Sequence, residues 1–300
     1  MKSKENTVTQ VLSHAVCTIF SLSAILPLLL LVIASFTKNS WAVTNGFSFF
    51  PKELSLSAYT YISSQWALIG RGYLNTILVT FAGTAIGLTF STLFAYGISH
   101  SEIPGMKLVS FLLVFSMLFN GGLVSTYYTY INIFPVKDTF WAQVIPNLMM
   151  NAFNVILIRN YFTNSIPPSL REAAKIDGAS EYRILAKIII PLSKPILATV
   201  GLFTALAYWN DWTNGLYYLS QRKGSQYFTI QNILNNINDN IQVILQNAST
   251  MSKMGTSVAD LPSTTVRMAI AVIGLLPILI LYPFFQKYFV KGITLGGVKE

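Results

Sequence analysis

Side chains that could carry out covalent or metal chemistry are few in this sequence of 300 residues. The one cysteine, Cys17, lies in an apolar run, and the two histidines, His14 and His100, are far apart. We therefore expect neither a disulfide framework nor a metal site. The sequence also lacks the Gly-x-x-x-x-Gly-Lys-Ser/Thr loop that cradles nucleotide phosphates, and it has no acidic cluster for magnesium. The chain is predicted to be no enzyme: it should bind no cofactor and cannot by itself hydrolyse ATP.

Polar, small and proline residues have their most informative spacing in the segment 159–194. There Ser169-Leu170-Arg171-Glu172 fits a capping box, in which a serine hydroxyl and a glutamate side chain bind each other's backbone amides. A short helix should therefore start at Ser169. Asp177-Gly178 should end it, because glycine readily adopts the left-handed conformation. A second helix is expected from Ser180 to about Ile190, where two prolines follow.

Two interpretations of this helix pair stay open. Leu170, Ala173 and Ala174 give the first helix a face of small and apolar groups, which a groove in a partner protein could accept. The pair could instead be an interfacial amphipathic segment that rests on lipid.

Three asparagines, Asn147, Asn151 and Asn154, have the spacing i, i+4 and i+7, which predicts that they share one face of a helix. Three amides that faced hydrocarbon would cost on the order of several kcal/mol, so this face should look into protein or water. Either the amides form hydrogen bonds between helices, or they form a polar strip for a hydroxyl-rich ligand, since asparagine both donates and accepts.

The elements that must position these residues follow from composition. The chain is 53% hydrophobic and 10% charged, whereas an ordinary soluble domain is about 25% charged. This excludes a solvated globular enzyme, and the scattering of Lys and Arg between apolar runs argues against nucleic-acid binding. Six runs lack Asp, Glu, Lys and Arg, and each can hold one membrane helix of about 20 residues. They are 16–36, 72–99, 108–136, 139–158, 195–210 and 268–286. The predicted fold is an all-α membrane protein with six transmembrane helices.

Glycines add two expectations. Gly83 and Gly87 form a Gly-x-x-x-Gly in the second run, which permits the close approach of another helix. Gly121-Gly122 could break the third helix and line a cavity or simply end it, and we expect the end.

The distribution of positive charge predicts the sidedness. With the amino terminus inside, the inner segments are 1–15, 100–107, 159–194 and 287–300, and they carry more than half of the 20 Lys and Arg. Because cytoplasmic loops are enriched in these residues, both termini should be cytoplasmic.

The predicted organisation has three parts. A cytoplasmic amino terminus (1–15) precedes a six-helix transmembrane domain (16–286) with the inner loop 159–194 and the outer loop 211–267. A cytoplasmic tail (287–300) follows. Within the outer loop, 231–247 is predicted to be an amphipathic surface helix, either a solvated cap or a docking element for an external partner.

The inner loop resembles a known motif. Glu172-Ala173-Ala174, Asp177-Gly178-Ala179, Ile188, Pro191-Leu192 and Pro195 resemble, in register, the EAA loop of bacterial ABC-importer permeases. In that family the loop forms the coupling helices that dock into the nucleotide-binding subunit. The resemblance implies that the ATPase-coupling residues here are Glu172, Ala173, Ala174, Asp177, Gly178 and Ala179.

Other stretches are similar to the carbohydrate-uptake branch, in particular to its MalG-type and LplC/YtcP-type subunits. They are Phe49-Phe50-Pro51-Lys52 with Ser57 and Tyr59, Asn120-Gly121-Gly122-Leu123, and Trp209-Asn210-Asp211. The tail is similar to the carboxyl end that in the family reaches into the ATPase dimer, so the resemblance implies ATPase contacts for Gly296, Gly297, Val298 and Lys299.

Together the resemblances imply a permease subunit of an ATP-driven importer for a carbohydrate, with an oligosaccharide as the expected substrate, in the bacterial cell membrane. The expected partners are a homologous permease subunit, two ATP-binding subunits that hold ATP and magnesium, and an extracytoplasmic solute-binding protein. The candidate substrate-path residues are Asn147, Asn151, Asn154, Trp209, Asn210 and Asp211. For the tryptophan, anchoring at the membrane interface is the alternative.

Two other functions stay open. An ion-coupled transporter or channel normally carries a charged side chain within a span. The six runs contain none, although backbone carbonyls can also bind sodium. A membrane scaffold could use 159–194 to recruit a cytosolic protein without any transport.

Overall fold

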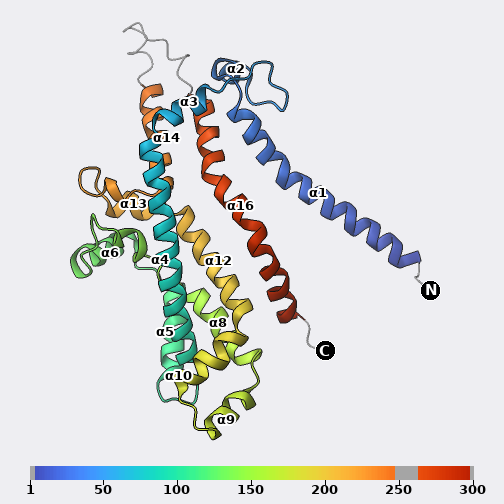
Figure 1. Cartoon of the computed structure of the whole chain (residues 1–300), viewed down its shortest axis with the longest axis vertical. Coiled ribbons are helices and arrows are strands. Elements are labelled where there is room, and N and C mark those ends of the chain that lie inside the picture. Colours follow the sequence, from blue (N-terminus) through green and yellow to red (C-terminus); the bar gives the residue numbers. More distant parts are fainter. Residues whose placement is uncertain (1–3, 247–262, 298–300) are drawn as a thin grey trace. The chain divides into compact units, whose positions relative to one another are not determined.

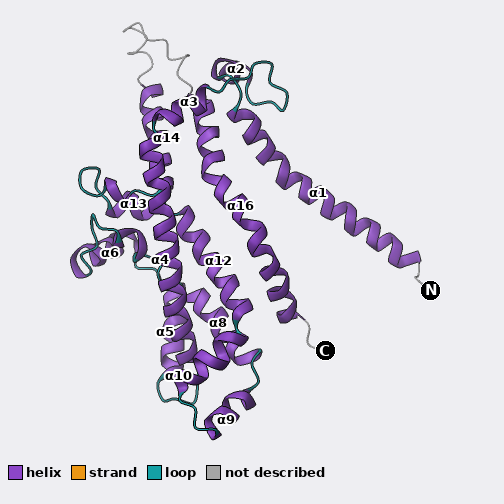
Figure 2. Ribbon diagram, in the orientation of Figure 1, coloured by secondary structure: helices purple, strands orange, loops and turns teal. Residues whose placement is uncertain are grey.

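Helices make up the regular structure of the protein. The computed structural model describes residues 4–246 and 263–297, and within these residues it has no β-strand, only an isolated bridge between Thr37 and Leu54 (Figure 1, Figure 2). The α-helical fold class predicted from composition is thereby confirmed.

The described elements follow one another along the chain in this order. They are α1 (Lys4–Ser35), α2 (Asn39–Asn45), α3 (Ser57–Ser64), α4 (Trp66–Ser99), α5 (Met106–Leu118), α6 (Gly122–Tyr128), the π-helix η1 (Thr129–Ile133), α7 (Trp141–Val144), α8 (Ala152–Asn164), α9 (Pro168–Ile176), α10 (Glu181–Ile184), the π-helix η2 (Leu185–Ile189), α11 (Ile190–Leu192), α12 (Lys194–Asn210), α13 (Thr213–Tyr218), the 3-10 helix η3 (Ser225–Tyr227), α14 (Ile230–Gln246) and α16 (Ser263–Gly297).

The chain divides into two compact units. One comprises residues 1–67 and 234–278, and the other comprises residues 68–233 and 279–300. Every contact that builds the candidate site lies in the second unit.

Two of the described helices have the length and hydropathy of a membrane span. They are residues 9–35 of α1 and the 34-residue α4. The segments Glu181–Leu192 and Lys194–Asn210 add a third if they form one span, with a bend of 81° between them. On α4, Leu74, Ile77 and Phe81 are all more than half exposed. An apolar surface of this kind indicates contact with lipid or with another chain.

The third and fourth uncharged runs do not form single helices, which corrects the prediction for 108–136 and 139–158. α5 ends at Leu118, and the chain resumes as α6 at Gly122, whose φ is 81°. α7 ends at Val144 and α8 starts at Ala152, with Asn147 at a φ of 61° between them. A left-handed residue interrupts a right-handed helix, and glycine and asparagine adopt that conformation at little cost. α5 ends before Gly121-Gly122 and a helix resumes at Gly122, so the two glycines lie at a break in the run, and the prediction that they simply end the third helix is wrong.

The fifth and sixth runs lie in α12 and α16. α12 has Pro195 in its first turn, where a missing amide hydrogen and a fixed φ are tolerated. The run 268–286 is the middle of the longer α16, so the predicted tail is helical as far as Gly297. The expected amphipathic helix in the outer loop forms as α14.

One apolar core joins the carboxyl end of α4 to the helices that follow it (Figure 1). α4, α5, α8, α9, α10, η2 and α12 contribute to it. Its buried members are Ala95, Tyr96, Ile98, Leu113, Val155, Ile158, Phe162, Ile166, Ala174, Ile184, Leu185, Ile189 and Val200. Burying one large apolar side chain contributes about 1.5–3 kcal/mol. This core therefore fixes the inner loop on the helix bundle.

Candidate functional site

The start of α9 differs from the predicted capping box. The helix begins at Pro168, one residue before Ser169, and the residue that precedes it is the extended Pro167 (φ −58°, ψ 131°), which makes no side-chain cap hydrogen bond. A proline forces the residue before it out of the α conformation and is itself well suited to the first helical position. Ser169 therefore lies inside the first turn, and the prediction that it caps the helix is wrong.

The end of α9 is a glycine-dependent turn, as predicted. Gly178 has a φ of 75°. Its amide donates to the carbonyl of Lys175 (3.0 Å), and the amide of Ala179 donates to the carbonyl of Ala174 (2.9 Å). This pair of bonds is the Schellman motif, which satisfies carbonyls that the last helical turn leaves free. The turn reverses the chain tightly enough that α10 starts at Glu181.

The second predicted helix forms in three pieces, α10, η2 and α11. The π-helical turn of η2 ends shortly before Pro191. Proline has no amide hydrogen to donate to the carbonyl four residues earlier, that of Lys187, so regular α-helical bonding is impossible at this point. The chain then bends by 81° into α12.

The outward surface of α9 and the start of α10 is apolar and acidic at once. Ile176 is 86% exposed and Tyr182 is 83% exposed. Leu170, Glu172, Ala173, Asp177 and Gly178 are exposed beside them. These seven residues are called the α9–α10 surface below. Exposed apolar side chains in so short a segment indicate contact with a partner protein or with lipid, and the choice between these two interpretations stays a prediction.

The inward side of the same segment belongs to the core. Ala174 is 8% exposed, and Ala179 packs against the core. Of the six predicted coupling residues, four thus lie on the α9–α10 surface, while Ala174 and Ala179 hold that surface in place.

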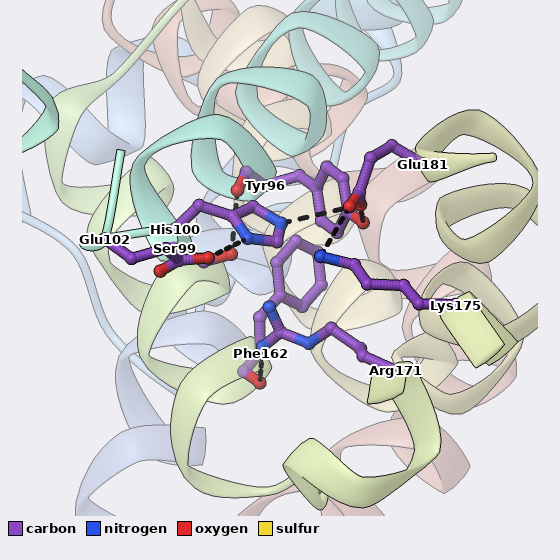
Figure 3. A network of polar contacts seen from close by, with 8 residues as sticks. All are labelled: Tyr96, Ser99, His100, Glu102, Phe162, Arg171, Lys175 and Glu181. Atoms are coloured by element: carbon purple, nitrogen blue, oxygen red, sulfur yellow. Dashed lines mark hydrogen bonds and ion pairs between the residues drawn. The ribbon is translucent and has the colours of Figure 1, made fainter. Parts of the chain in front are cut away.

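A polar network that the sequence did not reveal lies beside this surface (Figure 3). The carboxylate of Glu181 accepts hydrogen bonds from the Tyr96 hydroxyl of α4 (2.6 Å) and the Lys175 ammonium of α9 (2.8 Å). These two donors, Lys175 first, hold the pKa of the Glu181 carboxyl below its ordinary value of 4.5. Because 85 residues separate Tyr96 from Glu181, no local pattern could have predicted their contact.

The three asparagines do not share a helical face, which corrects the spacing argument. Asn147 is exposed in the break between α7 and α8. Asn151 is the N-cap of α8, and its side chain accepts from the amides of Phe153 (2.9 Å) and Asn154 (3.3 Å). Only Asn154 lies on the helix.

Asn154 makes a contact between helices, which was one of the two alternatives for the asparagines beside a polar strip for a ligand. Its amide nitrogen lies 3.4 Å from the Thr204 hydroxyl of α12. A role for the three asparagines in the substrate path stays a prediction.

The residues at the end of α12 have three different environments. Trp209 is buried, and its ring lies 6.5 Å from that of Tyr73 between centroids. Asn210 is exposed. Asp211 caps α13, since its carboxylate accepts from the Thr213 hydroxyl (2.6 Å) and amide (3.1 Å). Contact of these residues with a substrate stays a prediction.

The predicted tail contacts fall at the end of the described chain. Gly296 and Gly297 are the last residues of α16, whereas Val298 and Lys299 lie outside the described residues.

A family model described as "Binding-protein-dependent transport system inner membrane component" matches residues 103–295 of this chain. The match includes the whole α9–α10 surface.

Two curated proteins are similar over nearly the full length. The polygalacturonan/rhamnogalacturonan transport system permease protein YtcP of Bacillus subtilis (strain 168) is 38% identical over 297 residues, which cover 98% of this chain and 99% of that protein. The arabinooligosaccharides transport system permease protein AraQ of Halalkalibacterium halodurans is 29% identical, covering 92% and 91%.

A solved structure has a similar fold. It is a chain of a bacterial ABC transporter involved in the import of the acidic polysaccharide alginate, with a TM-score of 0.77 and 31% sequence identity. The match covers 96% of this chain and 99% of that one.

Proposed function

Because this chain belongs to the family of binding-protein-dependent transport system inner membrane components, we propose that it is a permease subunit of an ATP-driven importer for an oligosaccharide. Members of the family are transport components rather than catalytic enzymes. The observation that carries the proposal is the exposed α9–α10 surface, which lies inside the matched region and is held by a Schellman turn on a buried core.

The substrate class rests on the relatives. They are named for the transport of polygalacturonan and rhamnogalacturonan and of arabinooligosaccharides, and the similar structure belongs to an importer of alginate. An oligosaccharide derived from a polysaccharide is therefore the proposed cargo, and acidic oligosaccharides are the first to test.

The proposed assembly has this chain beside a homologous permease subunit in the bacterial cell membrane, with both termini in the cytoplasm. Two ATPase subunits bind ATP and magnesium in the cytosol, and one of them docks on the α9–α10 surface. A solute-binding protein delivers the sugar from outside. The excess of Lys and Arg in the inner segments supports this orientation.

The proposed mechanism is alternating access. Closure of the ATPase dimer moves α9 and α10, and the core that contains Ala174, Ile184 and Phe162 carries the movement into α4, α8 and α12. Rigid packing makes such a transfer efficient, because a close-packed core is displaced as a unit rather than compressed.

Substitution of Gly178 tests the proposal. A Cβ atom there would meet nothing within 4 Å, so Gly178→Val disturbs the chain through its φ of 75° and not by a clash. The left-handed conformation costs a residue with a side chain roughly 1–2 kcal/mol, which should reshape the turn. We expect normal membrane insertion and ATP hydrolysis that no longer drives uptake. Gly178→Asn should retain more coupling, because asparagine tolerates this conformation better.

A control variant separates the effect of the location of Gly178 from the effect of a positive φ alone. Gly46 also has a positive φ (77°) and open space around it, but it lies in the loop after α2. Gly46→Val should leave coupling unchanged. If the Gly178→Val transporter, reconstituted with its partners, imports sugar at the normal rate per ATP, the proposed role of the α9–α10 surface is wrong.

A further inference from the structure

Glu181 lies where three parts of the second unit meet. It is the first residue of α10, and its two carboxylate oxygens are shared between different elements. One oxygen accepts from Lys175 at the end of α9 (2.8 Å), and the other accepts from the Tyr96 hydroxyl near the end of α4 (2.6 Å). Figure 3 shows the Tyr96 and Lys175 side chains converging on the carboxylate.

His100 adds a further group on the α4 side. Its side chain is only 8% exposed, and its Nδ1 lies 2.8 Å from the Glu102 carboxylate. Its Nε2 is buried without a hydrogen-bond partner and lies 3.9 Å from the Glu181 carboxylate, which is too long for a hydrogen bond. The ring stands edge-on to that of Tyr96, with 4.8 Å between centroids. Glu181 thus meets two side chains that the end of α4 holds in place.

The network of Glu181 also borders a cavity. A cavity of about 730 Å³ opens beside the network. Its apolar lining includes Leu93 and Gly97 of α4, Ile103 of the following loop, and Leu185 of η2. Tyr96, His100, Lys175 and Glu181 line the same cavity, so the hydrogen bonds of Glu181 connect α4 to α10 on the cavity side, beside the apolar core that also joins them.

We propose that Glu181 is a positioning residue that links the α9–α10 surface to the end of α4, so that a movement imposed on α9 and α10 is passed to α4. This inference rests on the proposed function and names a second route for the movement beside the apolar core. Hydrogen bonds to a carboxylate are about twice as strong as neutral ones, which suits a link that must transmit force.

The proposed link reaches beyond the ion pair between α9 and α10. The Lys175–Glu181 pair alone would connect only α9 to α10, on either side of the Gly178 turn. The Tyr96 hydroxyl makes the connection to α4, so removal of that one atom should reproduce the effect of removing the charge of Glu181.

The experiment uses the complete transporter in liposomes and measures sugar taken up per ATP hydrolysed. Glu181→Gln preserves the shape and removes the charge, and we expect about a fivefold drop in this ratio, the lower end of typical coupling between sites. Tyr96→Phe should lower the ratio in the same direction. The double variant should be no worse than the more impaired single variant, because both changes act on one connection.

A matched ion pair provides the control. Lys38 and Glu53 are also 2.8 Å apart, with side chains 54% and 51% exposed, close to the 49% and 48% of Lys175 and Glu181. Glu53→Gln should leave the ratio unchanged. A drop of the same size in Glu53→Gln would mean that loss of any such pair has this effect and would overturn the proposal.

Removal of Lys175 separates the link to α4 from the ion pair between α9 and α10. Lys175→Met breaks the ion pair but leaves the Glu181 carboxylate as the acceptor for the Tyr96 hydroxyl. We expect this variant to lower the ratio less than Tyr96→Phe does, whereas a larger drop than in Tyr96→Phe would contradict the link to α4. A wild-type transporter that shows no ATP-driven uptake would refute the proposed function itself. If the wild type and Glu181→Gln take up equal amounts of sugar per ATP hydrolysed, this inference is refuted and the proposed function is not.

Discussion

Gly83 of α4 lies so close to the ring of Tyr208 of α12 that a Cβ atom on the glycine would be 2.3 Å from the Tyr208 Cζ. Tyr208 is completely buried, and its hydroxyl donates to the carbonyl of Val144 (2.8 Å). The absence of a side chain at Gly83 therefore lets α4 and α12 approach and lets the tyrosine reach α7. Four residues later, a Cβ on Gly87 would lie 2.6 Å from the Met149 carbonyl oxygen. The close approach of another helix, predicted from the Gly-x-x-x-Gly spacing, is confirmed at Gly83, whereas Gly87 is approached by the connection between α7 and α8.

Replacing Gly83 should therefore destabilise the second unit. Gly83→Ala forces the Tyr208 ring to move, and overpacking of this kind costs about 1–3 kcal/mol. We expect a melting temperature lowered by several degrees in detergent, measured by the thermal loss of helical circular dichroism.

Gly70 provides the comparison, because it lies in the same helix and a Cβ there would meet nothing within 4 Å. Gly70→Ala should be neutral or slightly stabilising, since alanine is the better helix former by about 1 kcal/mol. Equal melting temperatures for the Gly83 and Gly70 variants would contradict the close contact.

The N-cap at Asn151 gives a second prediction. Asn151→Ala removes the acceptor of two amides and should cost about 1 kcal/mol, which corresponds to a melting temperature lower by about 2–4 °C. Asn151→Ser keeps an acceptor and should retain most of the stability. If alanine and serine give the same melting temperature but different sugar uptake, the side chain serves the substrate path rather than the helix.

The third prediction is a pH dependence. The pKa of Glu181 is lowered by its hydrogen bonds to Lys175 and Tyr96, so its stabilisation is present above the ordinary value of 4.5 and is lost as the pH falls through the lowered one. At pH 7 the wild type should melt about 1–3 °C above Glu181→Gln, a difference kept small because the pair is half exposed. The difference should shrink as the pH is lowered below 4.5. A difference that stays constant at acid pH would show that the carboxylate charge contributes nothing.

Local chemistry explains which parts of the site could be predicted from the sequence. The turn at Gly178 follows from one residue type and its neighbours, and the helix after it follows from short-range periodicity. The start of α9 was misplaced by one residue because the preference of Pro168 for the first turn outweighs the capping box of Ser169 and Glu172.

Features that depend on chain breaks or distant contacts were not predictable in the same way. The lack of charged residues in 139–158 predicts an apolar segment, but it cannot show whether that segment is one continuous helix or is interrupted at Asn147. Tyr96 and Glu181 lie far apart in the sequence, so no local sequence pattern predicts the hydrogen bond between them.

Site-specific photo-crosslinking from position 176 tests the central claim most directly. Ile176 is 86% exposed on the α9–α10 surface, and Phe50, which is 88% exposed in the loop between α2 and α3, is the control position. A photoreactive phenylalanine analogue at each site would be irradiated in membranes that contain the whole transporter. The account predicts a covalent adduct between position 176 and the ATPase subunit, and none from position 50. An ATPase adduct from position 50 but not from position 176 would contradict it.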